Sequence, residues 1–355
     1  MKQVALSLAL LLFILSVITV QSSEQPGSPI SSYGIVNNPT HKLWWGPAVS
    51  NTAWGYNYWG NSFGEAQIEV LKRNGATAIR FMLDKYAWDL GSTANVLHIP
   101  YKDYIKQLVA WCKPELKVLL DLSRDSRTGN DWDTGTGKAE VIQNSALRTA
   151  WINWGKSVIA YCKPDAIGLM NEPRGDVSFN YYYDNFVIPS INAYRSVNPN
   201  IIVFVMSIPF HDLSGYATKP INDEKVVYQF HFYYNYPVSG SASQLAVNMA
   251  NAYGKGRFAE ARNYLTQYFN WEFSGLPKNR IAFGELGIYG RDWSTEPTDP
   301  NWQIFMEDAF DYAKENGLYG CFQYAVGRTH YCMLDPATGY TTLTPYGQTW
   351  ADNSP

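Results

Sequence analysis

Short apolar runs alternate with amphipathic stretches along most of the chain. Seven of these runs have the length and composition of strands buried on both faces, at 76–83, 116–123, 165–172, 201–208, 226–233, 280–287 and 320–326. A further run at 43–49 is expected to be the first strand. The stretches between them carry apolar residues at helical spacing, and several end in Gly or Asn, as helices do. This alternation predicts an α/β fold, a single (β/α)8 TIM barrel, rather than a doubly wound sheet.

The N-terminal segment does not follow this pattern. One Lys precedes an uncharged run from Val4 to Val20, and small polar residues follow it. This order is typical of a secretory signal peptide, residues 1–22, with cleavage near residue 22. An uncleaved membrane anchor is the alternative, because the run approaches the roughly 20 residues that span a bilayer. We therefore expect a secreted protein in which residues 23–355 form one domain.

Composition and charge exclude some partners. Charged residues make up 17% of the 355 residues, the formal net charge is −3, and no cluster of Lys and Arg occurs. Nucleic acid is therefore not an expected partner, and no stable membrane partner is expected. The chain is expected to be a monomer. Aromatic residues are abundant, with 13 Trp and 26 Tyr.

Two cysteines occupy equivalent places in an internal echo of the sequence. The segments "VAWCKPELKVLLDLS" and "IAYCKPDAIGLMNEP" align without gaps, so Cys112 and Cys162 both stand at the end of a helix. Consecutive helices are neighbours in a barrel, and an exported protein meets an oxidising environment. This predicts a Cys112–Cys162 disulfide, with two buried free thiols as the alternative. Cys321 and Cys332 remain, and their pairing is open.

Polar side chains gather where the predicted strands end. In a TIM barrel the active site lies at the C-terminal ends of the strands. The residues found there are Arg80, Ser123, Arg124, Asn171, Glu172, His231, Tyr233, Glu285 and Tyr324. Two of them are glutamates, on the fourth and the seventh strand. Paired carboxyl groups are what the cleavage of a glycosidic bond requires.

Several motifs resemble glycoside hydrolase family 5. "MNEP" ends the fourth strand and "GELG" ends the seventh, and their glutamates are 113 residues apart (285 − 172). The resemblance extends to Arg80 in "AIRFML", to His231 and Tyr233 in "QFHFYYNYP", and to the closing "TPYG". It touches most of the chain after residue 22. The order of these motifs is more specific than any one of them.

The resemblance implies a retaining, double-displacement glycosidase, with residues 23–355 as its catalytic barrel. Glu172 would be the general acid/base and Glu285 the nucleophile, with carboxyl groups about 5–5.5 Å apart. Arg80 beside Glu285 would keep it ionised, and Tyr233 would donate a hydrogen bond to it. The charge of Glu285 is expected to raise the pKa of Glu172, which must start the reaction protonated.

The other strand-end residues receive supporting roles. Asn171 is expected to bind the 2-hydroxyl of the sugar, and His231 to bind the substrate or Glu172. Tyr324 stands where the family usually has a Trp. A second departure from the family is "LLDLSRD", which has Ser123 and Arg124 where one or two His are common.

The aromatic residues fit a sugar-binding cleft, because aromatic rings stack on the apolar faces of pyranoses. The best candidate platform is "TAWGYNYWG", with Trp54 and Trp59. Other tryptophans in segments that follow strands are Trp88, Trp132 and Trp293. The expected ligand is therefore a β-linked polysaccharide or oligosaccharide.

These residues lead to a prediction of an endo-β-1,4-glucanase. A β-mannanase is the alternative within the family, since "NEPR" with Arg174 slightly favours it. A transglycosylase would use the same residues, and a non-catalytic polysaccharide-binding barrel is the alternative from another class. No cofactor and no metal ion are expected, because the chain has five His and no His-x-His pair.

Overall fold

The structure is a computed structural model of the chain. It describes residues 43–49, 63–93, 95–125, 136–209, 212–234, 243–288, 301–326 and 333–355. The chain divides into two units, residues 1–38 and 39–355, and all described residues belong to the second.

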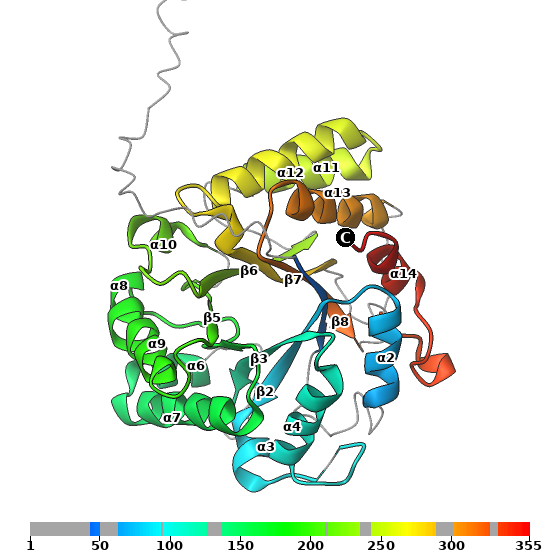
Figure 1. The fold of residues 1–355 in the computed structure, drawn as a ribbon. Helices are drawn as coiled ribbons and strands as arrows, with labels where there is room; N and C mark the ends of the chain where they lie inside the picture. The colour runs from blue at the N-terminus through cyan, green and yellow to red at the C-terminus, as the bar shows by residue number, and fades with distance from the viewer. Residues whose placement is uncertain are drawn as a thin grey trace, which may run out of the picture. The chain divides into compact units, whose positions relative to one another are not determined.

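Eight parallel strands form a closed barrel, and helices surround it (Figure 1). The strands are β1 (Trp44–Val49), β2 (Ala78–Asp84), β3 (Lys117–Arg124), β4 (Ala166–Gly168), β5 (Ile202–Val205), β6 (Val226–Tyr234), β7 (Ile281–Ile288) and β8 (Gly320–Val326). Each strand pairs with the next in sequence, and β8 closes the barrel on β1. The predicted (β/α)8 barrel is confirmed.

The principal helices follow the strands in sequence, and the last of them comes after β8. They are α2 (Glu65–Arg73), α4 (Tyr101–Cys112), α7 (Ser145–Cys162), α9 (Ile188–Arg195), α10 (Ser214–Thr218), α11 (Ser243–Gly254), α12 (Phe258–Glu272), α13 (Trp302–Glu315) and α14 (Pro345–Asp352). Shorter helical segments are α3 (Lys85–Leu90), α6 (Thr136–Gln143), α8 (Phe179–Tyr182), a π-helix at Tyr183–Val187, and 3₁₀ turns at Lys278–Arg280 and Pro336–Thr338. The closing helix α14 has a strong start signal, because the Thr344 side chain accepts from the Gly347 amide and Pro345 fills the first turn.

The barrel interior is divided into an apolar layer and a polar layer. The apolar cluster inside it is formed by Trp44, Ala78, Met82, Leu119, Ala166, Phe204, Val227, Ala282, Phe322 and Tyr324. Because side chains alternate along a strand, the inward position after Leu119 is Asp121, and the one after Val227 is Gln229. Both are buried, together with Arg80. These side chains form a buried polar layer that leads to the mouth of the barrel.

The predicted disulfide between Cys112 and Cys162 is wrong. Both are free thiols, and so is Cys321, while Cys332 lies outside the described residues. Cys112 continues the buried stripe of α4, and Cys162 that of α7. Each thiol lies in the hydrophobic core on the buried face of its own helix. Burial raises the pKa of both thiols to about 12.

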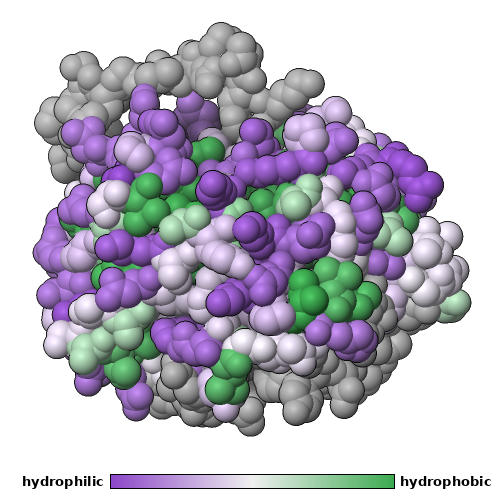
Figure 2. Space-filling view, turned by 60° about the horizontal axis from the view of Figure 1, so that its bottom comes forward, coloured by the Kyte–Doolittle hydropathy of each residue, from purple (hydrophilic) through white to green (hydrophobic). Residues whose placement is uncertain are grey.

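The surface is mixed in character. On the face seen in Figure 2, hydrophobic groups are interrupted by hydrophilic ones, which is ordinary for a folded protein. The described helices include none with the length and apolar character needed to cross a membrane.

Candidate active site

Glu172 reaches the barrel mouth through a sharp turn of the chain. After β4, the Asn171 amide still donates to the Leu122 carbonyl (2.8 Å), as in a strand. Glu172 then adopts φ of 45°, in the left-handed region that non-glycine residues rarely enter. Buried Lys138 holds this turn, because its ammonium donates to the Asn171 carbonyl at 2.6 Å. Backbone strain of this kind concentrates at functional sites.

Glu285 faces the interior because of a bulge in β7. Phe230 of β6 pairs with Phe283, but the next residue, His231, pairs with Glu285. Gly284 is therefore the extra residue of a β-bulge, and Phe283 and Glu285 no longer share a face of the sheet. Glu285 is buried beside His231 at the C-terminal end of the strand.

Arg80 connects the two glutamate-bearing segments. It is fully buried, and its guanidinium donates to Glu285 Oε1 (2.8 Å), Asn171 Oδ1 (2.5 Å) and Asp121 Oδ2 (2.8 Å). Burial alone would lower the pKa of Arg80, but the charges of Asp121 and Glu285 outweigh it and raise the pKa. The second oxygen of Glu285 accepts a hydrogen bond from the Tyr233 hydroxyl. Both oxygens of Glu285 are thus held by donors.

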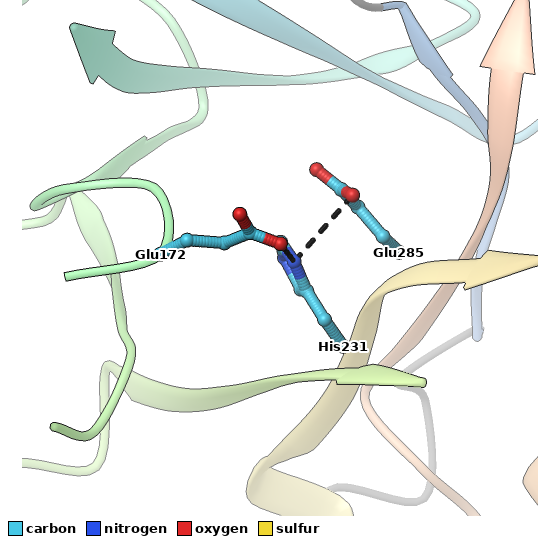
Figure 3. A group of neighbouring side chains, drawn as sticks. All are labelled: Glu172, His231 and Glu285. Carbon is cyan, nitrogen blue, oxygen red and sulfur yellow. Dashed lines mark hydrogen bonds and ion pairs between the residues drawn. The ribbon is translucent and has the colours of Figure 1, made fainter. Parts of the chain in front are cut away.

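Glu172 faces Glu285 across His231 (Figure 3). His231 Nδ1 lies 3.1 Å from Glu172 Oε1 and 3.5 Å from Glu285 Oε2. One oxygen of each glutamate and Nδ1 lie within 4.8 Å of one another. Carboxyl oxygens this near one another suit the short carboxyl separation of retaining glycosidases, roughly 5–5.5 Å, better than the roughly 6.5–9.5 Å of inverting ones.

The surroundings of Glu172 differ from the expectation. Burial raises the pKa of this carboxyl, but the hydrogen bond from His231, the charge that His231 carries when protonated, and the positive charges of Lys138 and Arg174 outweigh burial and lower it. Arg174 lies 3.4 Å from Glu172 Oε2. The charge of Glu285, which was expected to raise this pKa, is instead engaged by Arg80. The substrate-free site therefore favours ionised Glu172.

The remaining predicted residues fall into three groups. Tyr324 lines the site, with its ring edge-on to Tyr233 at 5.7 Å. The buried Ser123 Oγ and Asn171 Nδ2 have no hydrogen-bond partner among the described residues. Trp88 packs edge-on against the ring of Tyr161 on α7. The tryptophans Trp54, Trp59, Trp132 and Trp293, and the side chain of Arg124, lie outside the described residues.

Sequence reasoning missed three buried polar residues beneath the glutamates: Asp121, Gln229 and Lys138. A signal for two of them was present. Asp121 interrupts an apolar strand, and Gln229 shares the strand face of His231 and Tyr233 at a spacing of two. Lys138 follows a segment outside the described residues, and no local pattern marks it.

The group of Glu172, His231 and Glu285 also has the spacing of a metal site among the described residues. Its surroundings do not suit a cation. The guanidinium of Arg80 already neutralises Glu285, and the positive groups of Lys138 and Arg174 lie close to Glu172. The group fits a pair of reacting carboxyls better than a set of metal ligands.

A parallel barrel with two opposed carboxyl groups at the C-terminal ends of β4 and β7 defines a glycosidase-type active site. The family model for cellulase (glycosyl hydrolase family 5) matches residues 32–328. The chain belongs to this family, and it is a glycoside hydrolase of the retaining class. The suspected family resemblance is confirmed. Comparison with curated proteins finds no match.

Solved structures share the fold at low sequence identity. The endoglucanase Cel5A of Thermotoga maritima superposes with a TM-score of 0.60 at 12% identity, covering 87% of this chain and 97% of that chain. Its complex with mannotriose gives 0.58 at 11%, covering 89% and 98%. The catalytic domain of endoglucanase Cel5A from Thermobifida fusca, in complex with cellotetraose, gives 0.58 at 14%, covering 87% and 90%.

Proposed function

We propose that this protein is an endo-β-1,4-glucanase that hydrolyses its polysaccharide with retention of configuration. The observation that carries the proposal is the placement of Glu172 and Glu285, whose nearest oxygens lie within 4.8 Å at the barrel mouth. Carboxyl oxygens this close suit direct attack by one carboxylate on the anomeric carbon, which forms a covalent intermediate.

In this proposal Glu285 is the nucleophile. One of its oxygens attacks the anomeric carbon and forms the glycosyl-enzyme ester as the glycosidic bond breaks. Arg80 and Tyr233 bind its two oxygens, so the carboxylate is fixed before the sugar arrives. This positioning reduces the entropy that must be lost in the transition state.

Glu172 is the general acid/base. It protonates the leaving oxygen in the first step and removes a proton from the attacking water in the second. Since its surroundings favour the ionised form without substrate, we expect the bound sugar to raise the pKa of Glu172 by excluding water before the first step. Loss of the Glu285 charge in the ester then lowers this pKa again, which suits the base of the second step. Asn171 Nδ2 and Ser123 Oγ supply unpaired buried polar groups for the hydroxyls of the bound sugar.

β-Mannan is the second candidate substrate. Arg174 of "NEPR" pairs with Glu172 at the mouth of the site, where it can contact the sugar on the leaving side. One structural neighbour was solved with mannotriose, which supports keeping mannan in the test.

The experiment is reducing-sugar release from carboxymethylcellulose, mixed-linkage β-glucan, glucomannan and galactomannan. Glu285→Gln and Glu172→Gln are compared with Glu272→Gln, a buried glutamate on α12 that accepts from the Leu213 amide. Burial raises the pKa of Glu272 to about 8, so Gln mimics its neutral form. We expect activity on the glucans, lost by at least about 10³-fold in the first two variants only.

Other outcomes have clear meanings. Activity confined to the mannans would replace the substrate and keep the mechanism. Activity that survives Glu285→Gln would overturn the proposed nucleophile. A folded protein that binds these polymers without cleaving any of them would contradict the proposed function.

We also propose that the enzyme is exported and that residues 1–22 are removed as a signal peptide. The supporting observation is the uncharged run from Val4 to Val20 after a single Lys. N-terminal sequencing of the protein from a secreting host is expected to begin near Ser23. A protein that keeps Met1 and sediments with membranes would favour the uncleaved anchor.

A further inference from the structure

A chain of buried polar side chains runs beneath the two glutamates. Asp121 on β3, Gln229 on β6 and His231 on β6 are each at most 3% exposed. Gln229 Nε2 lies 3.1 Å from Asp121 Oδ2 and 3.0 Å from His231 Nε2. His231 in turn reaches Glu172 through Nδ1. The chain connects a carboxylate in the barrel interior to the carboxyl proposed as the general acid/base.

The charge of Asp121 decides how the Gln229 amide is turned. A carboxylate oxygen only accepts hydrogen bonds, so it must face the NH₂ end of the amide and not its oxygen. Arg80 Nε donates to the same Asp121 oxygen at 2.8 Å, and Nη2 lies 2.8 Å from that oxygen as an ion pair. The second N–H of the Gln229 amide is then left for His231.

This arrangement sets the protonation of the imidazole. A ring nitrogen that faces an N–H donor must present its lone pair, so His231 Nε2 carries no proton. The proton of the neutral ring is then on Nδ1, which faces Glu172 Oε1 at 3.1 Å. We propose that Asp121 and Gln229 are positioning residues that hold His231 in its neutral Nδ1–H form, as a fixed hydrogen-bond donor to Glu172.

Two glycines leave space in the barrel for the side chains of Asp121 and Gln229. A Cβ atom on Gly168 of β4 would lie 2.3 Å from Asp121 Oδ1. A Cβ atom on Gly284 of β7 would lie 2.3 Å from Gln229 Cγ and 2.6 Å from its Nε2. Neither glycine has a positive φ, so each serves close packing rather than chain conformation. The interior is shaped to accept these two side chains and no larger neighbours.

Several charged or titratable groups surround His231. They are Arg80 on β2, Asp121 on β3, Lys138 on α6, Glu172 and Arg174 after β4, Tyr233 on β6, Glu285 on β7 and Tyr324 on β8. The two glutamates lie 3.1 and 3.5 Å from Nδ1. An imidazolium there would hold Glu172 ionised and unable to act as an acid.

The consequence for the reaction rests on the proposed function of Glu172. A neutral donor can remain hydrogen-bonded to Glu172 while that carboxyl loses and regains its proton. A cation would stabilise only the ionised form. Gln229 therefore supports the cycling of Glu172 without contacting the substrate itself.

The first test is nitrogen NMR of the full chain with ¹⁵N-labelled histidine. In the wild type we expect His231 to show a protonated Nδ1 and an unprotonated Nε2 from pH 5 to pH 8. In Gln229→Glu the new carboxyl is either ionised or donates its proton to Asp121, the neighbour of Gln229 at 3.1 Å. An acceptor oxygen then faces Nε2, so Nε2 becomes protonated. Gln323→Glu is the matched control, since Gln323 is a buried strand glutamine that donates to the Tyr346 carbonyl. It should leave the His231 resonances unchanged.

The second test is the pH dependence of kcat/KM for the same variants. Gln229→Glu should move the alkaline limb to lower pH by about one unit, because an imidazolium lowers the pKa of Glu172. Gln323→Glu should leave the limb in place. A protonated Nε2 in the wild type, unchanged His231 resonances in Gln229→Glu, or a loss of activity equal at every pH would overturn the proposal. If no polysaccharide is cleaved at all, the resonances still decide the tautomer, so the two failures remain distinguishable.

Discussion

Arg80 is the residue on which the arrangement of the site depends most. Its planar guanidinium donates hydrogen bonds to Glu285, Asn171 and Asp121. Lys cannot reproduce this fork, because an ammonium is a point charge on a flexible stem. We predict that Arg80→Lys lowers kcat by at least about 100-fold and the free energy of unfolding by on the order of 2 kcal/mol, measured by steady-state kinetics and urea unfolding.

The matched control is Arg262→Lys. Arg262 pairs with Asp308, Asp311 and Glu315 in an ion-pair network between α12 and α13, and its side chain is 40% exposed. Exposed pairs contribute little, so stability should change by less than about 1 kcal/mol and kcat should not change. Equal losses in both variants would mean that Arg80 is only a structural residue.

Arg174 influences the pKa of the Glu172 carboxyl. Its positive charge is one of the causes that lower the pKa of this carboxyl. Arg174→Met should raise the pKa, so Glu172 keeps its proton to higher pH. The alkaline limb of kcat/KM, which reports the free enzyme, should then move to higher pH by about half a unit. A limb that stays in place or moves to lower pH would contradict the assignment of Glu172 as the acid.

At the scale of secondary structure, the bulge of β7 connects fold to chemistry. Gly284 is its extra residue, and a Cβ there would collide with Gln229. We predict that Gly284→Ala lowers the free energy of unfolding by about 1–3 kcal/mol and also lowers kcat, because the neighbouring Glu285 must shift. Gly254→Ala at the end of α11, where nothing lies within 4 Å, is the control and should change neither quantity.

The helix-end cysteines give a second prediction at this scale. Cys112 and Cys162 are buried free thiols with a pKa of about 12. Iodoacetamide without reductant should therefore spare both residues in the folded protein and alkylate both after urea unfolding. Peptide mass spectrometry decides the outcome. A disulfide-linked pair of peptides would show that the internal echo of the sequence does predict a covalent bond.

For the molecule as a whole, the pattern of apolar runs was sufficient to predict the barrel. Strand ends pointed to Glu172 and Glu285 because an apolar run that stops on a carboxylate is unusual. The pattern could not show that β4 ends at Gly168, four residues before Glu172, since the turn after it depends on contacts with Leu122 and Lys138. The polar layer was missed for a similar reason. A buried Asp or Gln is stable only through partners on other strands, which no local pattern reveals.

The wrong prediction of a Cys112–Cys162 disulfide also arose because local sequence does not show how a helix packs. Equivalent sequence positions gave the correct element and the correct end of each helix. They did not give the direction of the side chains, which follows from the buried stripe of each helix.

The most direct test of the account is to trap the glycosyl-enzyme. A 2-deoxy-2-fluoro cellobioside with a good leaving group should form a long-lived ester, because fluorine at C2 destabilises the oxocarbenium-like transition state of both steps. Peptide mass spectrometry of the trapped protein should place the label on Glu285, and Glu285→Gln should remain unlabelled. A label on Glu172 or on another residue, or rapid turnover with inversion and no trapped ester, would contradict the central claim.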